Sequence, residues 1–304
     1  MTDLAIRKSK GSLHSIYYNS LYDFYTTKRI GGINEYGQND HNERVRGGKW
    51  FGGNEEQQGK DVIKKAMLGD PILYKSLKEK ISSLDERLGT FTAKGFVQKV
   101  AKSKRVTVHG KMGDEIDIHK VNSGKLDTAW SKKIRKTVDS QHKLVTLYID
   151  LSHNSNKDCL DTLWTSAVSV KLLADLEKEG KSVKIIVGGT VQSSLSGSRD
   201  MVSVGITVKE YNERLAPERL AAMSHLGFYR SWGFMAHHDH NFGRVCSSIG
   251  HALGNVSQHH LPINIQEEIE KGHTRLIVIQ KSLNLWDAER SIKSARKQIA
   301  DFKD

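Results

Sequence analysis

The chain has 304 residues, of which 37% are hydrophobic and 27% are charged, and such a composition can bury the core of one or two globular domains. Two cysteines, Cys159 and Cys246, are too few for a disulfide framework, and no apolar run approaches the roughly 20 residues of a membrane span. Because the amino terminus also lacks a signal-peptide pattern, we expect a cytoplasmic protein that makes no membrane contact.

The formal net charge is +12, and most of this excess lies in the middle of the sequence. Residues 60–143 contain 20 Lys or Arg against 10 Asp or Glu, whereas residues 1–59 contain 8 against 7 and residues 144–304 contain 19 against 18. Concentrated positive charge is typical of proteins that bind a polyanion. Two alternatives stay open, namely a Lys-rich surface that only maintains solubility and an acidic protein partner.

Residues 1–143 predict a mixture of helices and strands. The aromatic segment from Leu13 to Tyr25 has helical spacing, with an inner face expected at Tyr18, Leu21, Tyr22 and Tyr25. Further helices are predicted at residues 57–68 and 72–88, on either side of Gly69-Asp70-Pro71. Alternating apolar residues predict two strands, 105–109 and 115–119, joined as a hairpin.

From residue 144 onward, apolar runs alternate with helical patterns. Strands are predicted at residues 144–149, 183–187, 201–208 and 275–280. Helices are predicted at residues 158–179, 216–224, 226–236 and 287–302, and a glycine-containing loop at 188–197. This alternation indicates an α/β fold with a mainly parallel, helix-covered sheet. The predicted organisation is a basic α+β region at residues 1–143 followed by an α/β core at residues 144–304.

A polar motif, Asp150-Leu-Ser152-His-Asn154, follows the first of these strands. Ligands of α/β proteins bind at the carboxyl ends of the strands, so this motif is the first candidate site. The same residues could instead cap the following helix or tie the loop together without a ligand.

The motif, the long helix after it and the next strand together resemble the start of a von Willebrand factor A-like domain, where the opening motif is Asp-x-Ser-x-Ser. That family binds a divalent cation through the motif and through a threonine and an aspartate from later loops. The resemblance therefore implies Mg²⁺ or Mn²⁺ on Asp150, Ser152 and Asn154, whose amide oxygen can also ligate a hard cation. Asp239 is the positional candidate for the later aspartate, while residues 212–219 contain no threonine.

The order of several short motifs also resembles a group of bacteriophage proteins of unknown function. These motifs are Trp50-Phe-Gly-Gly53, the helix ending at Gly69-Asp70, Gly113-Asp-Glu-Ile-Asp117 and the A-like core. The resemblance covers about residues 45–240, and it implies a phage protein that acts in the cytoplasm of the infected cell.

A second candidate site is His237-His238-Asp239-His240, because histidines and a carboxylate can bind a transition metal. Adjacent residues point in different directions, however, so a polar loop at a helix end is the alternative. The chain has no Gly-x-Ser-x-Gly motif, and Gly188-Gly189-Thr190 lacks the Lys-Ser/Thr ending of a phosphate-binding loop. No catalytic residues are therefore predicted.

We expect a nucleic-acid-binding accessory protein that supports phage transcription or replication, with single-stranded DNA as the ligand and a phage or host polymerase or replication protein as partner. The expected contacts come from the two densest basic clusters: Lys99, Lys102, Lys104, Arg105, Lys132, Lys133, Arg135 and Lys136. A protein-interaction or assembly module with a metal-assisted A-like site is the first alternative. A metal-dependent enzyme acting on nucleotides or phosphodiesters is the second.

Overall fold

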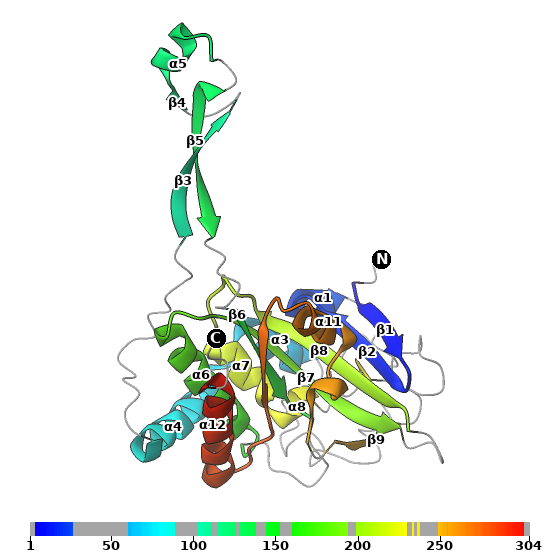
Figure 1. Cartoon of the computed structure of the whole chain (residues 1–304). Helices are drawn as coiled ribbons and strands as arrows, with labels where there is room; N and C mark the ends of the chain where they lie inside the picture. Colours follow the sequence, from blue (N-terminus) through cyan, green and yellow to red (C-terminus); the bar gives the residue numbers. More distant parts are fainter. Residues whose placement is uncertain are drawn as a thin grey trace.

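A computed structural model describes residues 4–26, 60–88, 103–110, 115–125, 128–137, 144–152, 160–193, 199–229, 233, 236–237, 249–253 and 255–300 (Figure 1). The strands are β1 (Ile6–Lys10), β2 (Leu13–Tyr18), β3 (Ser103–Gly110), β4 (Glu115–Ile116), β5 (Trp130–Thr137), β6 (Leu144–Asp150), β7 (Ser182–Ser193), β8 (Met201–Lys209), β9 (Ile249–Ala252) and β10 (Arg275–Ile279).

The helices are α1 (Leu21–Thr26), α3 (Lys60–Leu68), α4 (Pro71–Leu88), α5 (Ile118–Asn122), α6 (Leu163–Lys178), α7 (Pro217–Ser224), α8 (Leu226–Phe228), α11 (Ile263–Glu270) and α12 (Leu285–Ala300), together with the 3₁₀ helix η6 (Gln258–His260). Within the described part of the chain, none of these helices combines the length and the apolar character needed to cross a membrane.

The main sheet has the strand order β1-β2-β8-β7-β6-β10, and β9 pairs with β7. The pairs β2–β8, β7–β6 and β6–β10 are parallel, whereas β1–β2, β8–β7 and β7–β9 are antiparallel. The α/β class is therefore confirmed, but the sheet is mixed rather than mainly parallel. The reason is the short connection between β7 and β8, because only antiparallel strands can be joined without a long crossover.

The predicted boundary between residues 143 and 144 does not divide the core. β2 pairs with β8 in the main sheet, so an amino-terminal strand completes the carboxy-terminal fold. Ile16 of β2 and Leu77 of α4 belong to the same hydrophobic cluster as Leu147 of β6. Among the described strands, β3, β4 and β5 alone form a separate sheet.

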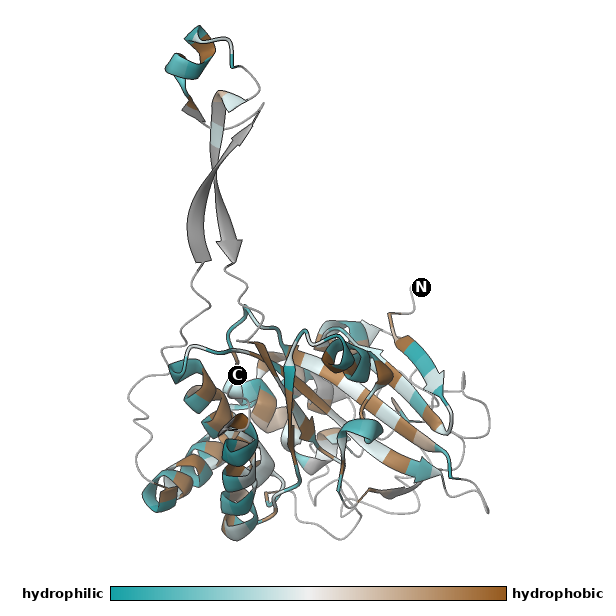
Figure 2. Cartoon of the chain, in the orientation of Figure 1, coloured by the Kyte–Doolittle hydropathy of each residue, from teal (hydrophilic) through white to brown (hydrophobic). Residues whose placement is uncertain are grey.

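Apolar residues cover both faces of the main sheet, as the brown strands of Figure 2 illustrate. Leu147 and Ile149 of β6 pack in the large cluster that contains residues of α4, α6, α7 and α12. Tyr148, between them, packs in a smaller cluster with Leu261 and with Ile265 of α11. Successive strand residues point to opposite faces, so the continuous apolar run of β6 reflects burial on both sides.

The aromatic segment near the amino terminus is a strand followed by a short helix, so the predicted helix is found only at residues 21–26, and its expected inner face was wrong. Tyr17 and Tyr18 are buried in β2, and Phe24 is buried in α1, whereas Tyr22 and Tyr25 are 62% and 44% exposed. Residues 13–18 pair with both β1 and β8. These two ladders of backbone hydrogen bonds favour an extended chain, whatever the spacing of the aromatic residues.

The remaining strands form a three-stranded sheet in the order β3-β5-β4. The predicted hairpin between residues 105–109 and 115–119 is absent from it, because β3 and β4 each pair with β5. Residues 118–122 are helical because the Asp117 carboxylate accepts hydrogen bonds from the N–H groups of His119 and Lys120. Figure 1 shows β3 and β5 as a long two-stranded ribbon that projects from the body, with α5 at its tip.

Candidate functional site: a basic ribbon and a buried ion pair

The paired segments of the ribbon, β3 and β5, contain six basic residues and no acidic residue. They are Lys104, Arg105, Lys132, Lys133, Arg135 and Lys136. The structure thus brings six of the eight predicted nucleic-acid contacts onto one ribbon, and Lys99 and Lys102 lie outside the described residues. This grouping joins two sequence clusters that are separated by more than twenty positions.

The register of the ribbon places like charges directly opposite each other. Lys104 pairs with Lys136, and Arg105 pairs with Arg135. Directly opposed like charges destabilise an antiparallel pair, because their Cβ atoms lie only about 4.5–5.5 Å apart. Alternation along the strands gives each face of the ribbon three basic positions.

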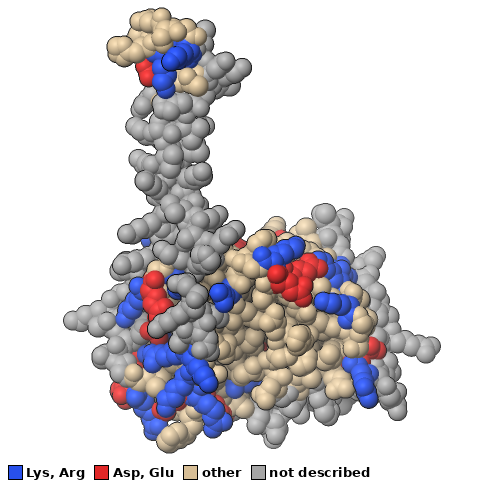
Figure 3. All heavy atoms as spheres, in the orientation of Figure 1, with Lys and Arg blue, Asp and Glu red and all other residues tan. Residues whose placement is uncertain are grey.

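A second group of basic side chains covers α4 and α12, where blue spheres gather in the lower left of Figure 3. Several of these charges are already matched by acids. The Arg87 guanidinium lies 3.1 Å from a Glu289 carboxylate oxygen, and the Arg296 guanidinium lies 3.0 Å from an Asp175 carboxylate oxygen. These ion pairs neutralise part of the positive charge on the helical surface.

The predicted site at Asp150 lies at the carboxyl end of a parallel strand of the main sheet. β6 ends at Asp150 and lies between β7 and β10, both of which run parallel to it. Asp150 and Ser152 are both fully buried there. One Asp150 oxygen, Oδ1, accepts hydrogen bonds from the Ser152 N–H at 3.0 Å and from its hydroxyl at 2.6 Å.

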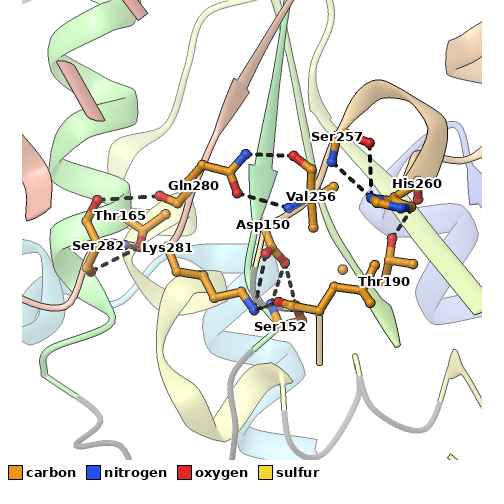
Figure 4. A network of polar contacts seen from close by, with 12 residues as sticks. Asp150, Ser152, Thr165, Thr190, Val256, Ser257, His260, Gln280, Lys281 and Ser282 are labelled. Carbon is orange, nitrogen blue, oxygen red and sulfur yellow. Dashed lines mark hydrogen bonds and ion pairs between the residues drawn. The ribbon is translucent and has the colours of Figure 1, made fainter. Parts of the chain in front are cut away.

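The second carboxylate oxygen of Asp150 faces a lysine. The Lys281 ammonium lies 3.4 Å from Oδ2 and also donates a hydrogen bond to the Leu253 carbonyl (Figure 4). Burial raises the pKa of the Asp150 carboxyl above its usual value, and the Lys281 charge and the Ser152 hydrogen bonds oppose this rise. Asp150 and Lys281 thus form a buried salt bridge, in which the Lys281 side chain is mostly enclosed.

Two anchors on either side of Lys281 fix its position (Figure 4). The Gln280 side chain accepts a hydrogen bond from the Val256 N–H at 3.0 Å and donates one to the Val256 carbonyl at 2.6 Å. The Thr165 hydroxyl of α6 accepts a hydrogen bond from the Ser282 N–H at 2.9 Å. The chain leaving β10 is thus fastened to a neighbouring loop and to a helix, and Lys281 is directed toward Asp150.

The groups around the Asp150 carboxylate determine whether a divalent cation fits the site. Of the four predicted ligands, the structure brings Asp150 and Ser152 together, and Asn154 and Asp239 lie outside the described residues. The Lys281 ammonium already supplies a positive charge to the carboxylate, and it would repel a second cation. Among the described residues, no group of three or more His, Cys, Asp or Glu side chains could hold a metal. The described residues fit an internal ion pair and do not fit a metal centre.

The predicted loop at residues 188–197 begins as strand, because β7 continues to Ser193. Gly188 lies so close to β8 that an added Cβ atom would be 2.0 Å from the Val204 carbonyl oxygen. Gly189 is similarly close to Ser152, with 2.8 Å between an added Cβ and the Ser152 Cβ. These glycines allow the backbone to approach the Asp150 turn, and they do not form a phosphate-binding loop.

Of the histidine cluster at residues 237–240, the structure describes His237. His237 is fully buried, and its ring nitrogens lie 2.9 Å from the Gly233 carbonyl oxygen and 3.1 Å from the Gly189 carbonyl oxygen. Both nitrogens are thus directed at backbone carbonyls. His237 secures the segment against β7 and does not present a nitrogen to a metal.

Lys281 is the site residue that the sequence motifs did not reveal. A signal for it exists, since Lys281 follows β10 by two positions, and β10 is the strand beside β6. The order of the strands in the sheet, however, is not evident from the apolar runs alone.

Comparison with known proteins adds a family but no function. The profile of the family described as Domain of unknown function (DUF7192) matches residues 7–301. Searches of curated proteins and of solved structures found no significant match.

Proposed function

The chain belongs to the DUF7192 family, and we propose that it binds nucleic acid through the ribbon formed by β3 and β5. The observation that carries this proposal is the composition and register of the ribbon: six basic residues, no acidic residue, and two pairs of like charges placed opposite each other. Such an arrangement lowers the stability of the free ribbon and is favourable when phosphates lie against it.

The shape of the ribbon supports the same proposal. Neighbouring strands lie about 4.8 Å apart, and the major groove of B-form DNA, about 12 Å wide, admits a two-stranded ribbon. Because basic positions occur on both faces, the ribbon can contact the two phosphate backbones that border a groove. Because the ribbon projects from the body, it can contact a duplex or a single strand while the main sheet stays clear of the nucleic acid (Figure 1).

The wider role proposed here rests on the resemblances seen in the sequence. We propose a bacteriophage accessory protein in the infected cell, which holds single-stranded DNA for transcription or replication and contacts a phage or host polymerase or replication protein. The body would have a von Willebrand factor A-like core that serves binding and not chemistry. Its strand β6, parallel to both neighbours and ending in Asp150, is compatible with that core.

The test compares two triple variants that remove the same charge from different places. Lys132→Gln, Lys133→Gln and Lys136→Gln neutralise the ribbon, whereas Lys75→Gln, Lys271→Gln and Lys297→Gln neutralise exposed lysines of the body. Binding to single- and double-stranded DNA and RNA is measured across a salt series. We expect the ribbon variant to bind more weakly and to reduce the slope of log K against log salt by roughly 0.7–0.9 for each phosphate that is no longer neutralised.

The body variant is expected to keep the affinity and the slope of the native protein, because its substitutions leave the ribbon intact. Its net charge equals that of the ribbon variant, which makes it a matched control. Equal losses in both variants would show that overall charge, and not the ribbon, governs binding. Failure of the native protein to bind any of the four ligands at low salt would refute the proposal.

A further inference from the structure

The tip of the ribbon exposes two isoleucine side chains. Ile116, at the end of β4, is 47% exposed, and Ile118, at the start of α5, is 64% exposed. Burying an isoleucine fully stabilises a protein by about 1.5–3 kcal/mol, and these two residues forgo much of that gain. Two exposed apolar side chains near the end of a projecting element are therefore a candidate contact surface.

The backbone around these residues is firmly held. Asp117, between the two isoleucines, caps α5 through its side chain, and its N–H donates a hydrogen bond to the Ala129 carbonyl at 2.7 Å. Ala129 is fully buried, and Lys120 of α5 donates a hydrogen bond to the Thr128 carbonyl at 3.3 Å. The capped helix is thus fixed to the chain that leads into β5, and it presents the isoleucines in a defined geometry.

The charge of the ribbon that leads to the tip indicates what these side chains contact. Lys125, on the same tip, is exposed, and the six basic residues of β3 and β5 lie along the ribbon that leads to it. Figure 3 shows both blue and red side chains beside uncharged atoms at the tip. The acidic residues next to the isoleucines are Glu115 and Asp117, and the Asp117 carboxylate lies 3.9 Å from the Lys120 ammonium. Exposed apolar side chains at the end of a basic ribbon are complementary to a nucleic acid, because a nucleic acid combines an anionic backbone with apolar stacked bases.

We propose that Ile116 and Ile118 form an apolar wedge that inserts between stacked bases of a duplex held by the ribbon. This inference rests on the proposed nucleic-acid binding and adds its structural consequence. Aliphatic side chains have no groups for reading base edges, but they can separate a base step and kink the helix. Unstacking one step costs a few kcal/mol, and the additional contacts along the bent duplex can offset that cost. Local opening of the duplex would also expose single-stranded bases to the protein.

The experiment uses short DNA duplexes that carry 2-aminopurine at successive positions, because the fluorescence of this base rises when it unstacks. The full-length native protein is compared with an Ile116→Ser, Ile118→Ser variant. We expect the native protein to raise the fluorescence severalfold at one or a few positions, and the variant to abolish this rise. Affinity should fall less than about tenfold, and the salt slope should stay unchanged, since the phosphate contacts remain.

An Ile72→Ser variant is the matched control, because Ile72 is an isoleucine that is 78% exposed on the body, at the start of α4. It should preserve the fluorescence rise. Native protein that binds the duplex without a rise, or a tip variant that retains it, would refute the wedge and leave the proposed function intact. Absence of duplex binding by the native protein, together with tip-dependent binding to vesicles of anionic lipid, would overturn the wedge in favour of membrane insertion.

Discussion

At the scale of single residues, the Asp150–Lys281 pair combines burial with opposite charge. Lys281→Met leaves the Asp150 carboxylate buried without its counter-charge, and such a change typically destabilises a protein by about 3–5 kcal/mol. We expect a loss of this size at neutral pH, measured as the free energy of unfolding in a denaturant titration. The double variant Asp150→Asn, Lys281→Met should regain much of it, because neither charge then remains buried.

The pH dependence of this loss follows from the direction of the pKa shift. The folded-state pKa of Asp150 is raised above its usual value of 3.8, so the folded protein holds the proton more tightly than the unfolded chain. The burial penalty is therefore fully present above the folded pKa and disappears as the pH falls below the unfolded pKa. Removing Lys281 raises the folded pKa further, so the loss should shrink on acidification. A loss that stays constant between neutral and acidic pH would contradict this account.

The same ion pair predicts how the protein responds to divalent cations. A cation at a hundred times its dissociation constant would stabilise the folded protein by about 2.7 kcal/mol. Because Lys281 already faces Asp150, we expect Mg²⁺ and Mn²⁺ to leave the Tm of the native protein unchanged in a thermal-shift titration. A rise in Tm that is lost in Asp150→Ala would instead show that Asp150 binds the ion, as the resemblance to A-like domains implies.

At the scale of elements, the sequence predicted what depends on local spacing and missed what depends on distant pairing. The helix at residues 71–88 and the strand at 144–150 were predicted closely, because a capped amphipathic pattern and a buried apolar run are local signals. The spacing of Tyr18, Leu21, Tyr22 and Tyr25 predicted a helix, and residues 21–26 are helical, yet pairing with β1 and β8 makes residues 13–18 a strand. No spacing within the segment reveals those partners.

The two candidate sites also differ in how much of each is evident from the sequence. Counting charges located the excess of lysine and arginine within residues 60–143, and the register of β3 with β5 then placed Lys104 opposite Lys136. The motif at Asp150 was also visible as a strand end. Its counter-charge, Lys281, comes from the far end of the sequence, because β10 lies beside β6 in the sheet. Charge composition is therefore readable from the sequence, whereas ion-pair partners require the topology.

At the scale of the whole molecule, the ribbon and the body have separate structural supports. The main sheet is enclosed by two hydrophobic clusters, and neither of them includes a ribbon residue whose side chain the structure describes, at positions 116–125, 128–129 and 131. The ribbon is held by its own strand pairing and by the capped helix at its tip. The body therefore does not need the ribbon in order to bury its core.

This separation predicts the effect of excising the ribbon. Replacing residues 103–137 with a short Gly-Ser linker should preserve one cooperative unfolding transition, with a Tm within a few degrees of the native value, because the core residues are untouched. Nucleic-acid affinity and its salt dependence should both fall, since the basic positions of β3 and β5 are removed. Circular dichroism during heating measures the first expectation and a mobility-shift assay the second. A folded body that binds nucleic acid as tightly as the native protein would place the interface outside the ribbon, and an unfolded body would show that the ribbon contributes to the core.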